Sequence, residues 1–314
     1  MIKLERYSKN PIIKPRENIW WEAKSVLNPA VIYDDGKIHM LYRAMGGDRI
    51  SRLGYCYSED GINFQGFRDV PIFESEPDNL YERLGCEDPR IVKLGDTFYI
   101  TYTSASLYPA TYPKERFATA AAPFRVRVSL LSTKDFSLFT RHGVIIPDID
   151  SKDAVLFPEK IDDQYVMLHR IWPDIWIAFS KDLKEWYDQK IIAKLRKTSW
   201  DSLKIGAGTN MLKTRFGWLN FYHGVDSNKV YRIGIMVLDL NDPTKVIYRS
   251  HESILTPEKE YEKNGFINNV VFASSAIEKN GEYFIYYGAA DSNICLARIE
   301  RDKLFDDIAK EIKI

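Results

Sequence analysis

The sequence predicts an all-β protein, a five-bladed β-propeller with a short C-terminal helix. One observation is a repeated sequence unit, called a phrase below, which consists of short strands separated by turns rich in Gly and Asp and occurs five times. Another is a Ser-x-Asp or Thr-Lys-Asp turn leading to an aromatic residue, which follows three of these phrases at residues 58–64, 133–136 and 180–186. Repeats of this length, built from antiparallel strands, are typical of propeller blades.

Each phrase contains a short strand, a polar turn, an aromatic-rich strand, a loop and a third strand. Strands are expected in the first two phrases at 29–33, 38–44, 52–58, 90–94, 98–103 and 126–132. In the other three they are expected at 157–161, 165–170, 175–180, 209–213, 218–224, 231–238, 272–277, 283–289 and 294–299. These phrases predict a single domain over residues 1–314, with blades at 28–65, 88–140, 155–190, 207–250 and 270–300.

Two segments depart from this pattern. Apolar residues at 304, 305, 308 and 312 fall on one helical face, which predicts a helix over 301–314 that covers a blade edge. The connection at 104–124 is unusually long and contains Tyr108 and Tyr112. Loops of this length in compact domains are usually lids or binding loops, so a role in substrate binding is expected.

Composition excludes several classes of partner. Lys plus Arg and Asp plus Glu both number 44, so no net field favours nucleic acid or an anionic membrane. The first residues lack the apolar core of a signal peptide, and no run of about 18 apolar residues predicts a membrane span. The three widely spaced cysteines indicate reduced thiols and a cytoplasmic protein. The neutral surface and tail helix are compatible with a homo-oligomer.

A charged tetrapeptide, Glu87-Asp88-Pro89-Arg90, stands at the entrance of a predicted strand. Proline fixes the turn, and side chains alternate along a strand, so we expect one of the two carboxylates to face inward. A single inward carboxylic acid in a sugar-sized pocket is a candidate general acid. The tetrapeptide alone is more typical of a turn Asp with a surface ion pair.

In a propeller the strand nearest the axis lines the channel, so the entrances of the five first strands converge. The expected entrances are Asn28-Pro29, Asp88-Pro89, 157–159, 206–209 and Asn268-Asn269. The second strands end in polar groups, at Arg43, Thr103, Arg170, His223 and Asp291. We therefore expect a polar site at one end of the channel.

The candidate residues for this site are predominantly cationic. The acids are Glu87, Asp88, Asp174 and Asp291, and the basic residues are Arg43, Arg52, Arg127, Arg170, Lys204 and His223. Several Arg and Lys around one pocket suit a phosphate, whereas a glycosidase needs two carboxylates flanking the bond. Phosphate is already anionic at pH 7 and needs no protein base, so the pattern favours phosphorolysis over hydrolysis. No cluster of metal ligands is present, and no cofactor is expected beyond inorganic phosphate as co-substrate.

These residues carry a resemblance that covers nearly the whole chain. The chain resembles glycoside hydrolase family 130, the five-bladed propeller β-mannoside phosphorylases. The matching stretches lie at 28–30, 41–44, 51–54, 87–91, 157–160, 167–170, 200–204, 222–224, 268–272 and 286–291. The chain departs from the family pattern at 206–210 and in the loop at 104–124.

The resemblance implies a reaction and roles for individual residues. Asp88 would be the catalytic acid of an inverting reaction, acting on the glycosidic oxygen through a hydroxyl of the bound mannose. The mannosyl unit would be held by Asn28, Arg43 and Asp291, and Asp174 is a further substrate-binding candidate. Phosphate would be surrounded by Arg127, Arg170, Lys204, His223 and Tyr231. The expected products from a β-mannoside oligosaccharide are α-mannose 1-phosphate and a shortened acceptor.

Two alternatives stay open at this point. A β-mannoside hydrolase on the same scaffold would need a carboxylate base near the phosphate site, for which Glu159 or Asp174 are the candidates. A sugar-binding propeller without catalysis would bind the same ligands without turnover. Neither the linkage, whether β-1,2, β-1,3 or β-1,4, nor the acceptor follows from the sequence.

Overall fold

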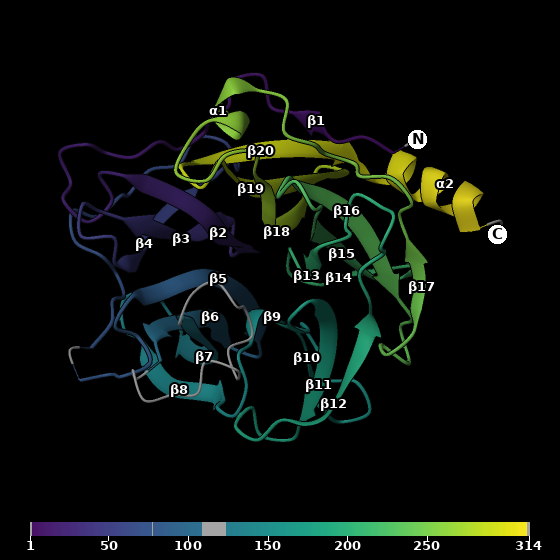
Figure 1. Cartoon of the computed structure of the whole chain (residues 1–314), viewed down its shortest axis with the longest axis horizontal. Coiled ribbons are helices and arrows are strands. Elements are labelled where there is room, and N and C mark those ends of the chain that lie inside the picture. Colours follow the sequence, from purple (N-terminus) through teal and green to yellow (C-terminus); the bar gives the residue numbers. More distant parts are fainter. Residues whose placement is uncertain (1, 77, 109–123, 313–314) are drawn as a thin grey trace.

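The structure, a computed structural model, describes residues 2–76, 78–108 and 124–312 (Figure 1). Its regular elements are strands and two helices, α1 (Glu260–Lys263) and α2 (Arg301–Ile312). The predicted mostly β class and the tail helix are therefore confirmed. Most of the expected binding loop, including Tyr112, lies outside the described residues.

The strands follow one another in five groups. The first two contain β2 (Ser25–Asp34), β3 (Lys37–Met45), β4 (Ser51–Ser58), β5 (Gly85–Leu94), β6 (Thr97–Leu107), β7 (Phe124–Thr133) and β8 (Thr140–Ile146). The third contains β9 (Lys152–Leu156), β10 (Tyr165–Ile171), β11 (Asp174–Ser180) and β12 (Tyr187–Ala193). The fourth contains β13 (Lys204–Gly206), β14 (Leu212–Thr214), β15 (Gly217–Val225), β16 (Tyr231–Leu238) and β17 (Val246–Arg249). The fifth contains β18 (Val271–Lys279), β19 (Glu282–Ala289) and β20 (Asn293–Glu300).

Neighbouring strands within each group are antiparallel, and they are consecutive in the chain except in the fourth group, where β13 and β14 both pair with β15. One parallel pair, Ser51 with Gly85, joins the first group to the second, so that these strands form a seven-stranded sheet. The fifth sheet is completed by β1 (Glu5–Arg6), which pairs with β20 from the other end of the sequence. Figure 1 shows the groups arranged around a common centre, with β2, β5, β9, β13 and β18 toward the inside.

The first strands of the third and fourth groups differ from the sequence prediction. The strand predicted at 157–161 is wrong, because β9 lies at Lys152–Leu156. The strand predicted at 209–213 is only partly present, because residues 207–211 form a break between β13 and β14. Within the interruption the side chain of Asn220 donates to the carbonyl of Thr209 and accepts from the N–H of Gly208. This amide replaces ladder hydrogen bonds, so the backbone leaves the strand path without losing its partners.

Four of the groups contain the same buried cluster, in which a carboxylate before the first strand accepts a hydrogen bond from a tyrosine of the second strand and pairs with an arginine. The clusters are Glu22–Tyr42–Arg16, Glu82–Tyr102–Arg141, Asp201–Tyr222–Arg196 and Glu262–Tyr287–Arg6. In the third group His169 stands at the corresponding place, 2.8 Å from the hydroxyl of Ser151. Each buried charge is thus paired and hydrogen-bonded, as burial requires.

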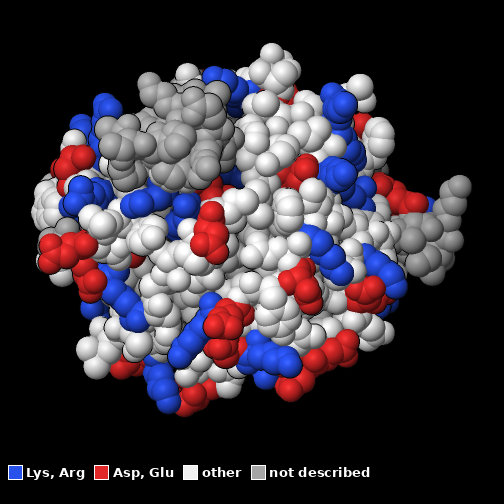
Figure 2. Space-filling view, turned by 60° about the horizontal axis from the view of Figure 1, so that its bottom comes forward, with Lys and Arg blue, Asp and Glu red and all other residues white. Residues whose placement is uncertain are grey.

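Helix α2 packs its apolar face on the fifth group. Leu304, Phe305 and Ile308 are buried in the same hydrophobic cluster as Ile2 and Leu4. The three cysteines are buried and form no disulfide. Among the described helices none is long and apolar enough to cross a membrane. Cationic and anionic side chains are interspersed on the face shown in Figure 2, with no broad area of one sign.

Candidate active site

The inner strands of the first three groups share one β-bulge. Leu27 and Ala30 pair with Arg43 and Leu41, so that one extra residue stands on β2. The same offset occurs on β5, where Glu87 and Arg90 pair with Thr103 and Thr101. It occurs again on β9, opposite β10. A bulge re-aims a side chain locally, and bulges are over-represented beside active sites.

The re-aimed residues are Asn28, Asp88 and Asp153, with φ angles of 45°, 49° and 55°. Asn and Asp tolerate this left-handed region better than other residues with a Cβ atom, which explains the residue type at each bulge. Asn28 also needs Gly288 opposite it, since a Cβ atom there would lie 2.1 Å from the Asn28 side-chain oxygen.

Asp88 is buried within a set of donors. Its Oδ1 accepts from Asn28 Nδ2 at 2.8 Å and from Arg43 Nη1 at 3.1 Å, while its Oδ2 lies 3.4 Å from Lys152 Nζ. Glu87 reaches the same cations, at 2.8 Å from Arg43 Nη2 and 3.8 Å from Lys152 Nζ. The expectation that one of the two carboxylates faces inward is therefore wrong, because the bulge interrupts the alternation of side chains.

The pKa values of Asp88 and Asp291 are shifted in opposite directions. Burial opposes the ionisation of Asp88, but Arg43, Lys152 and the Asn28 amide outweigh it and hold its pKa well below the usual range. For Asp291, at a φ of 49° just after β19, burial and the neighbouring negative charge of Asp88 raise the pKa to about 6, against the opposing effect of Arg43. The resting site therefore holds Asp88 ionised and Asp291 close to its titration point.

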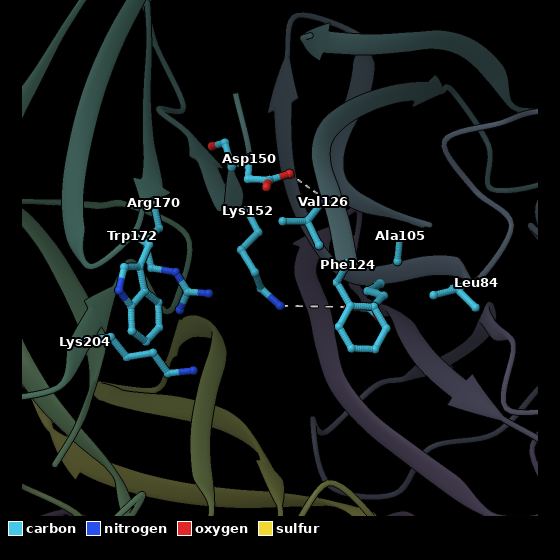
Figure 3. A pocket seen from close by; sticks show the side chains of 11 residues that line it. Leu84, Ala105, Phe124, Val126, Asp150, Lys152, Arg170, Trp172 and Lys204 are labelled. Carbon is cyan, nitrogen blue, oxygen red and sulfur yellow. Dashed lines mark hydrogen bonds and ion pairs between the residues drawn. The ribbon is translucent and has the colours of Figure 1, made fainter. Parts of the chain in front are cut away.

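A cavity of about 360 Å³ opens beside Glu87 and Lys152, and Lys152 in turn contacts Asp88. Figure 3 shows the side chains of Lys152, Arg170 and Lys204 turned toward a common space between Trp172 and Phe124. The cavity is lined by Leu84, Glu87, Ala105, Phe124, Val126, Asp150, Ser151, Lys152, Arg170, Trp172 and Lys204. Three cations converging on a small cavity with an apolar side suit an anion held beside an organic group.

Lys204 lies above two aromatic rings, 4.8 Å from the centroid of Tyr231 and 5.5 Å from that of Trp172. Burial, together with the positive charges of Arg170 and Lys152, lowers its pKa to about 7. Tyr231, predicted to surround phosphate, is thus placed beneath Lys204. Its own pKa is raised by burial.

His223 lies behind Arg170 and is completely buried, so it does not line the cavity as a phosphate ligand would. Its Nε2 lies 3.3 Å from Arg170 Nη1, which donates to it. Burial lowers the pKa of His223 to about 3, so the ring is neutral. Because Nε2 accepts, the proton of the neutral ring is on Nδ1.

Two predicted site residues are held by other partners. Arg127 pairs with Asp150, and its remaining donors reach the carbonyls of Pro147 and Val126 and the hydroxyl of Tyr108. Asp174 accepts a hydrogen bond from the N–H of Leu195 at 2.9 Å and does not line the cavity. Neither side chain is placed as a direct contact for a ligand in the cavity.

Sequence reasoning missed Lys152 and Asp153. Both lie in β9, upstream of the strand that was predicted from the Phe157-Pro158 pair. Spacing carried a usable signal. In the first two groups the bulge residue precedes the polar residue at the end of the second strand by 15 residues (28 to 43 and 88 to 103). The same spacing before Arg170 places the bulge of the third group near residue 155, upstream of the strand predicted from 157.

The titration of Lys204 leads to a prediction for the pH dependence of phosphate binding. Above pH 7 a growing fraction of this lysine is neutral, so the KM for phosphate is expected to rise, by up to about tenfold per pH unit for one required proton. Initial rates at pH 6.5 to 9 measure it. Lys204→Arg keeps the charge and serves as the control, because phosphate's own ionisation affects both proteins equally. A constant ratio of the two KM values across this range would contradict the prediction.

A mostly β scaffold that carries a buried carboxylate beside a cationic cavity has the features expected of glycoside-cleaving enzymes that use an anionic reactant. The comparison with protein families gives the particular member of this class. A family model described as beta-1,4-mannooligosaccharide phosphorylase matches residues 3–311. The chain belongs to this family, glycoside hydrolase family 130.

The chain is 45% identical to a 1,2-beta-oligomannan phosphorylase of Thermoanaerobacter sp. (strain X514), over 96% of this chain and 98% of the relative. Its fold is similar to that of the beta-1,2-mannobiose phosphorylase from Listeria innocua in complex with beta-1,2-mannobiose, with a TM-score of 0.83, 28% identity and coverage of 97% and 99%. It is also similar to a structure from work on family members that are glycoside hydrolases targeting beta-1,2 mannosidic linkages in Candida mannan, with a TM-score of 0.84, 26% identity and coverage of 96% and 94%.

Proposed function

We propose that this protein is an inverting β-mannoside phosphorylase that cleaves β-1,2-linked mannosides with inorganic phosphate. The products are α-mannose 1-phosphate and the shortened acceptor. The observation that carries the proposal is the convergence of Lys152, Arg170 and Lys204 on one cavity beside Asp88. The β-1,2 linkage is supported by the names of the phosphorylases from Thermoanaerobacter and Listeria innocua.

The site residues divide into two functions. Asn28, Arg43 and Asp291 surround the place of the mannosyl unit next to Asp88, and the three cavity cations hold phosphate. Phosphate attacks the anomeric carbon on the face opposite the leaving oxygen, so a single displacement inverts the configuration. Asp88 supplies the proton that the leaving oxygen needs, through a hydroxyl of the bound mannose.

The proton on Asp88 depends on the anion. In the resting site Arg43 and Lys152 favour the ionised carboxylate. A phosphate dianion beside Lys152 compensates part of this positive charge, which raises the pKa of Asp88 toward the range in which it carries a proton. Binding of the nucleophile thereby prepares the acid, and Lys152 is the group through which the two are coupled.

Hydrolysis on the same scaffold requires a carboxylate available to activate water. Among the described residues, the two carboxylates that line the cavity are each held by an arginine, Glu87 by Arg43 and Asp150 by Arg127. Of the two earlier candidates, Glu159 pairs with Lys213 on the surface and Asp174 holds a backbone N–H. These contacts favour phosphate as the nucleophile.

The proposal also includes the finer architecture. The five groups of strands around a common centre are the five blades of a single propeller domain, with the cavity at one end of its axis. This is supported by the likeness to family 130 structures over almost the whole chain. The equal numbers of acidic and basic residues support the further proposal that neither nucleic acid nor a membrane is a partner.

The experiment is incubation of the purified protein with a panel of β-linked mannobioses, with and without inorganic phosphate. Mannose 1-phosphate that forms from the β-1,2 disaccharide only when phosphate is present is the expected result. Free mannose at the same rate without phosphate would identify a hydrolase. Binding of the disaccharide without any product, in either direction of the reaction, would identify a sugar-binding protein.

A further inference from the structure

Asp153 is a completely buried carboxylate that does not line the cavity. It occupies on β9 the bulge position that Asp88 occupies on β5, and it comes directly after Lys152. Its Oδ2 lies 2.9 Å from Arg170 Nη1, as an ion pair, and 3.6 Å from His223 Nε2, but neither of its oxygens accepts a hydrogen bond from the residues that the structure describes. A buried carboxylate needs compensation, and Arg170 supplies it.

Arg170 is held from one side only. Its Nη1 contacts Asp153 and the acceptor nitrogen of His223. Its other nitrogen atoms have no partner in the described part of the chain, and the side chain lines the cavity. A guanidinium fixed at one nitrogen presents its remaining donors in a fixed direction, which is what bidentate recognition of a phosphate requires.

Gly206 of β13 leaves room for this arrangement. A Cβ atom at this position would lie 2.4 Å from His223 Cε1 and 2.6 Å from Asp153 Oδ2. Any larger residue would therefore force the histidine and the carboxylate out of their present positions against Arg170. The space is needed although Gly206 itself contributes no polar side chain.

We infer that Asp153 and His223 are positioning residues that orient Arg170 toward the reacting phosphate. The inference rests on the proposed phosphorylase function and deepens it. The two buried aspartates at equivalent bulges then have different tasks, since Asp88 acts on the glycoside and Asp153 acts through Arg170 on the nucleophile. Neither Asp153 nor His223 touches the substrate.

The test compares Asp153→Ala, Asp153→Asn and Gly206→Ala with the wild type, by initial rates in which phosphate and mannobiose are varied separately. Asp153→Ala and Gly206→Ala are expected to raise the KM for phosphate by about 10- to 100-fold, as for the loss of a charge-assisted contact. The KM for mannobiose stays within about threefold of the wild type. Asp153→Asn keeps the shape of the side chain but removes the charge that attracts Arg170, so its KM for phosphate is expected to rise nearly as much as that of Asp153→Ala.

The matched control is Glu262→Gln, which removes the charge of another buried carboxylate–arginine pair, in the fifth group. It is expected to lower the melting temperature without changing the ratio of the two KM values. An unchanged or lower KM for phosphate in Asp153→Ala would overturn the inference, since Asp153 would then only compete with phosphate for Arg170. If Asp153→Ala does not fold, the KM for phosphate of Gly206→Ala tests the inference instead, because this substitution changes no charge. Wild-type activity that is independent of phosphate would refute the phosphorylase function itself.

Discussion

Asp88→Asn is expected to lower kcat by about 10²- to 10⁴-fold, the usual contribution of a general acid. The amide has nearly the same shape as the carboxylate, and its oxygen still accepts from Asn28 or Arg43, but its N–H protons are not acidic enough to be transferred to the leaving oxygen. Loss of the negative charge next to Arg43 and Lys152 is not expected to weaken phosphate binding. The measurement is the rate of formation of mannose 1-phosphate, together with the KM for each substrate.

Asp291→Asn is the matched variant, since it changes the second carboxyl of the same region. It is expected to raise the KM for the mannoside and to remove from the pH profile of kcat/KM an ionisation near pH 6. An active Asp88→Asn together with an inactive Asp291→Asn would assign the acid role to Asp291 and would show that the proposed assignment is wrong.

Lys152→Met is the second substitution with a large expected effect. It removes one of the three cavity cations and also the ammonium that lies 3.4 Å from Asp88. The KM for phosphate is expected to rise by about 10- to 100-fold, which corresponds to one charge-assisted hydrogen bond. The pKa of Asp88 rises as well, because a positive charge that favoured its ionised form is absent.

The higher pKa of Asp88 is expected to shift the pH profile of kcat in one direction. Activity needs protonated Asp88 and falls as the pH increases through its pKa in the complex, so in Lys152→Met the falling limb of kcat moves to higher pH. Lys152→Arg retains the charge and is expected to keep the wild-type limb. A limb in the same place in both variants would mean that Lys152 binds phosphate without influencing the acid.

The strand order was predictable because each phrase has its own local signal. The turn at Asn280-Gly281 and the alternation in the aromatic strands locate β18 and β19 without tertiary information. The contacts of Asp88 with Asn28 and Arg43 follow from the expectation that strand entrances converge. Proline marked two of the three shared bulges, at Pro29 and Pro89.

The third bulge has Ala154 where the other two have proline, so no such mark was present. Phe157-Pro158 matched the expected pattern instead, and the strand was predicted five residues too late. Lys152 and Asp153 were missed for this reason. Arg127 was predicted as a phosphate ligand from the family resemblance, and Asp174 was a substrate-binding candidate because of its charge. Their hydrogen-bond partners, Asp150 and Leu195, lie 23 and 21 residues further along the chain. Such pairings depend on packing and cannot be predicted from spacing.

The pairing of β1 with β20 has a consequence for the order of folding. In the clusters of the first, second and fourth groups of strands the carboxylate and its tyrosine are about 20 residues apart in the chain, so these contacts form locally. Arg6 and Glu262 are 256 residues apart, and their contact brings together both ends of the sequence. The entropy of closing so long a loop is recovered only once the intervening sheets are in place. We therefore expect the amino-terminal strand to dock last, so that the nascent chain keeps an open β-edge until synthesis of β20 is complete.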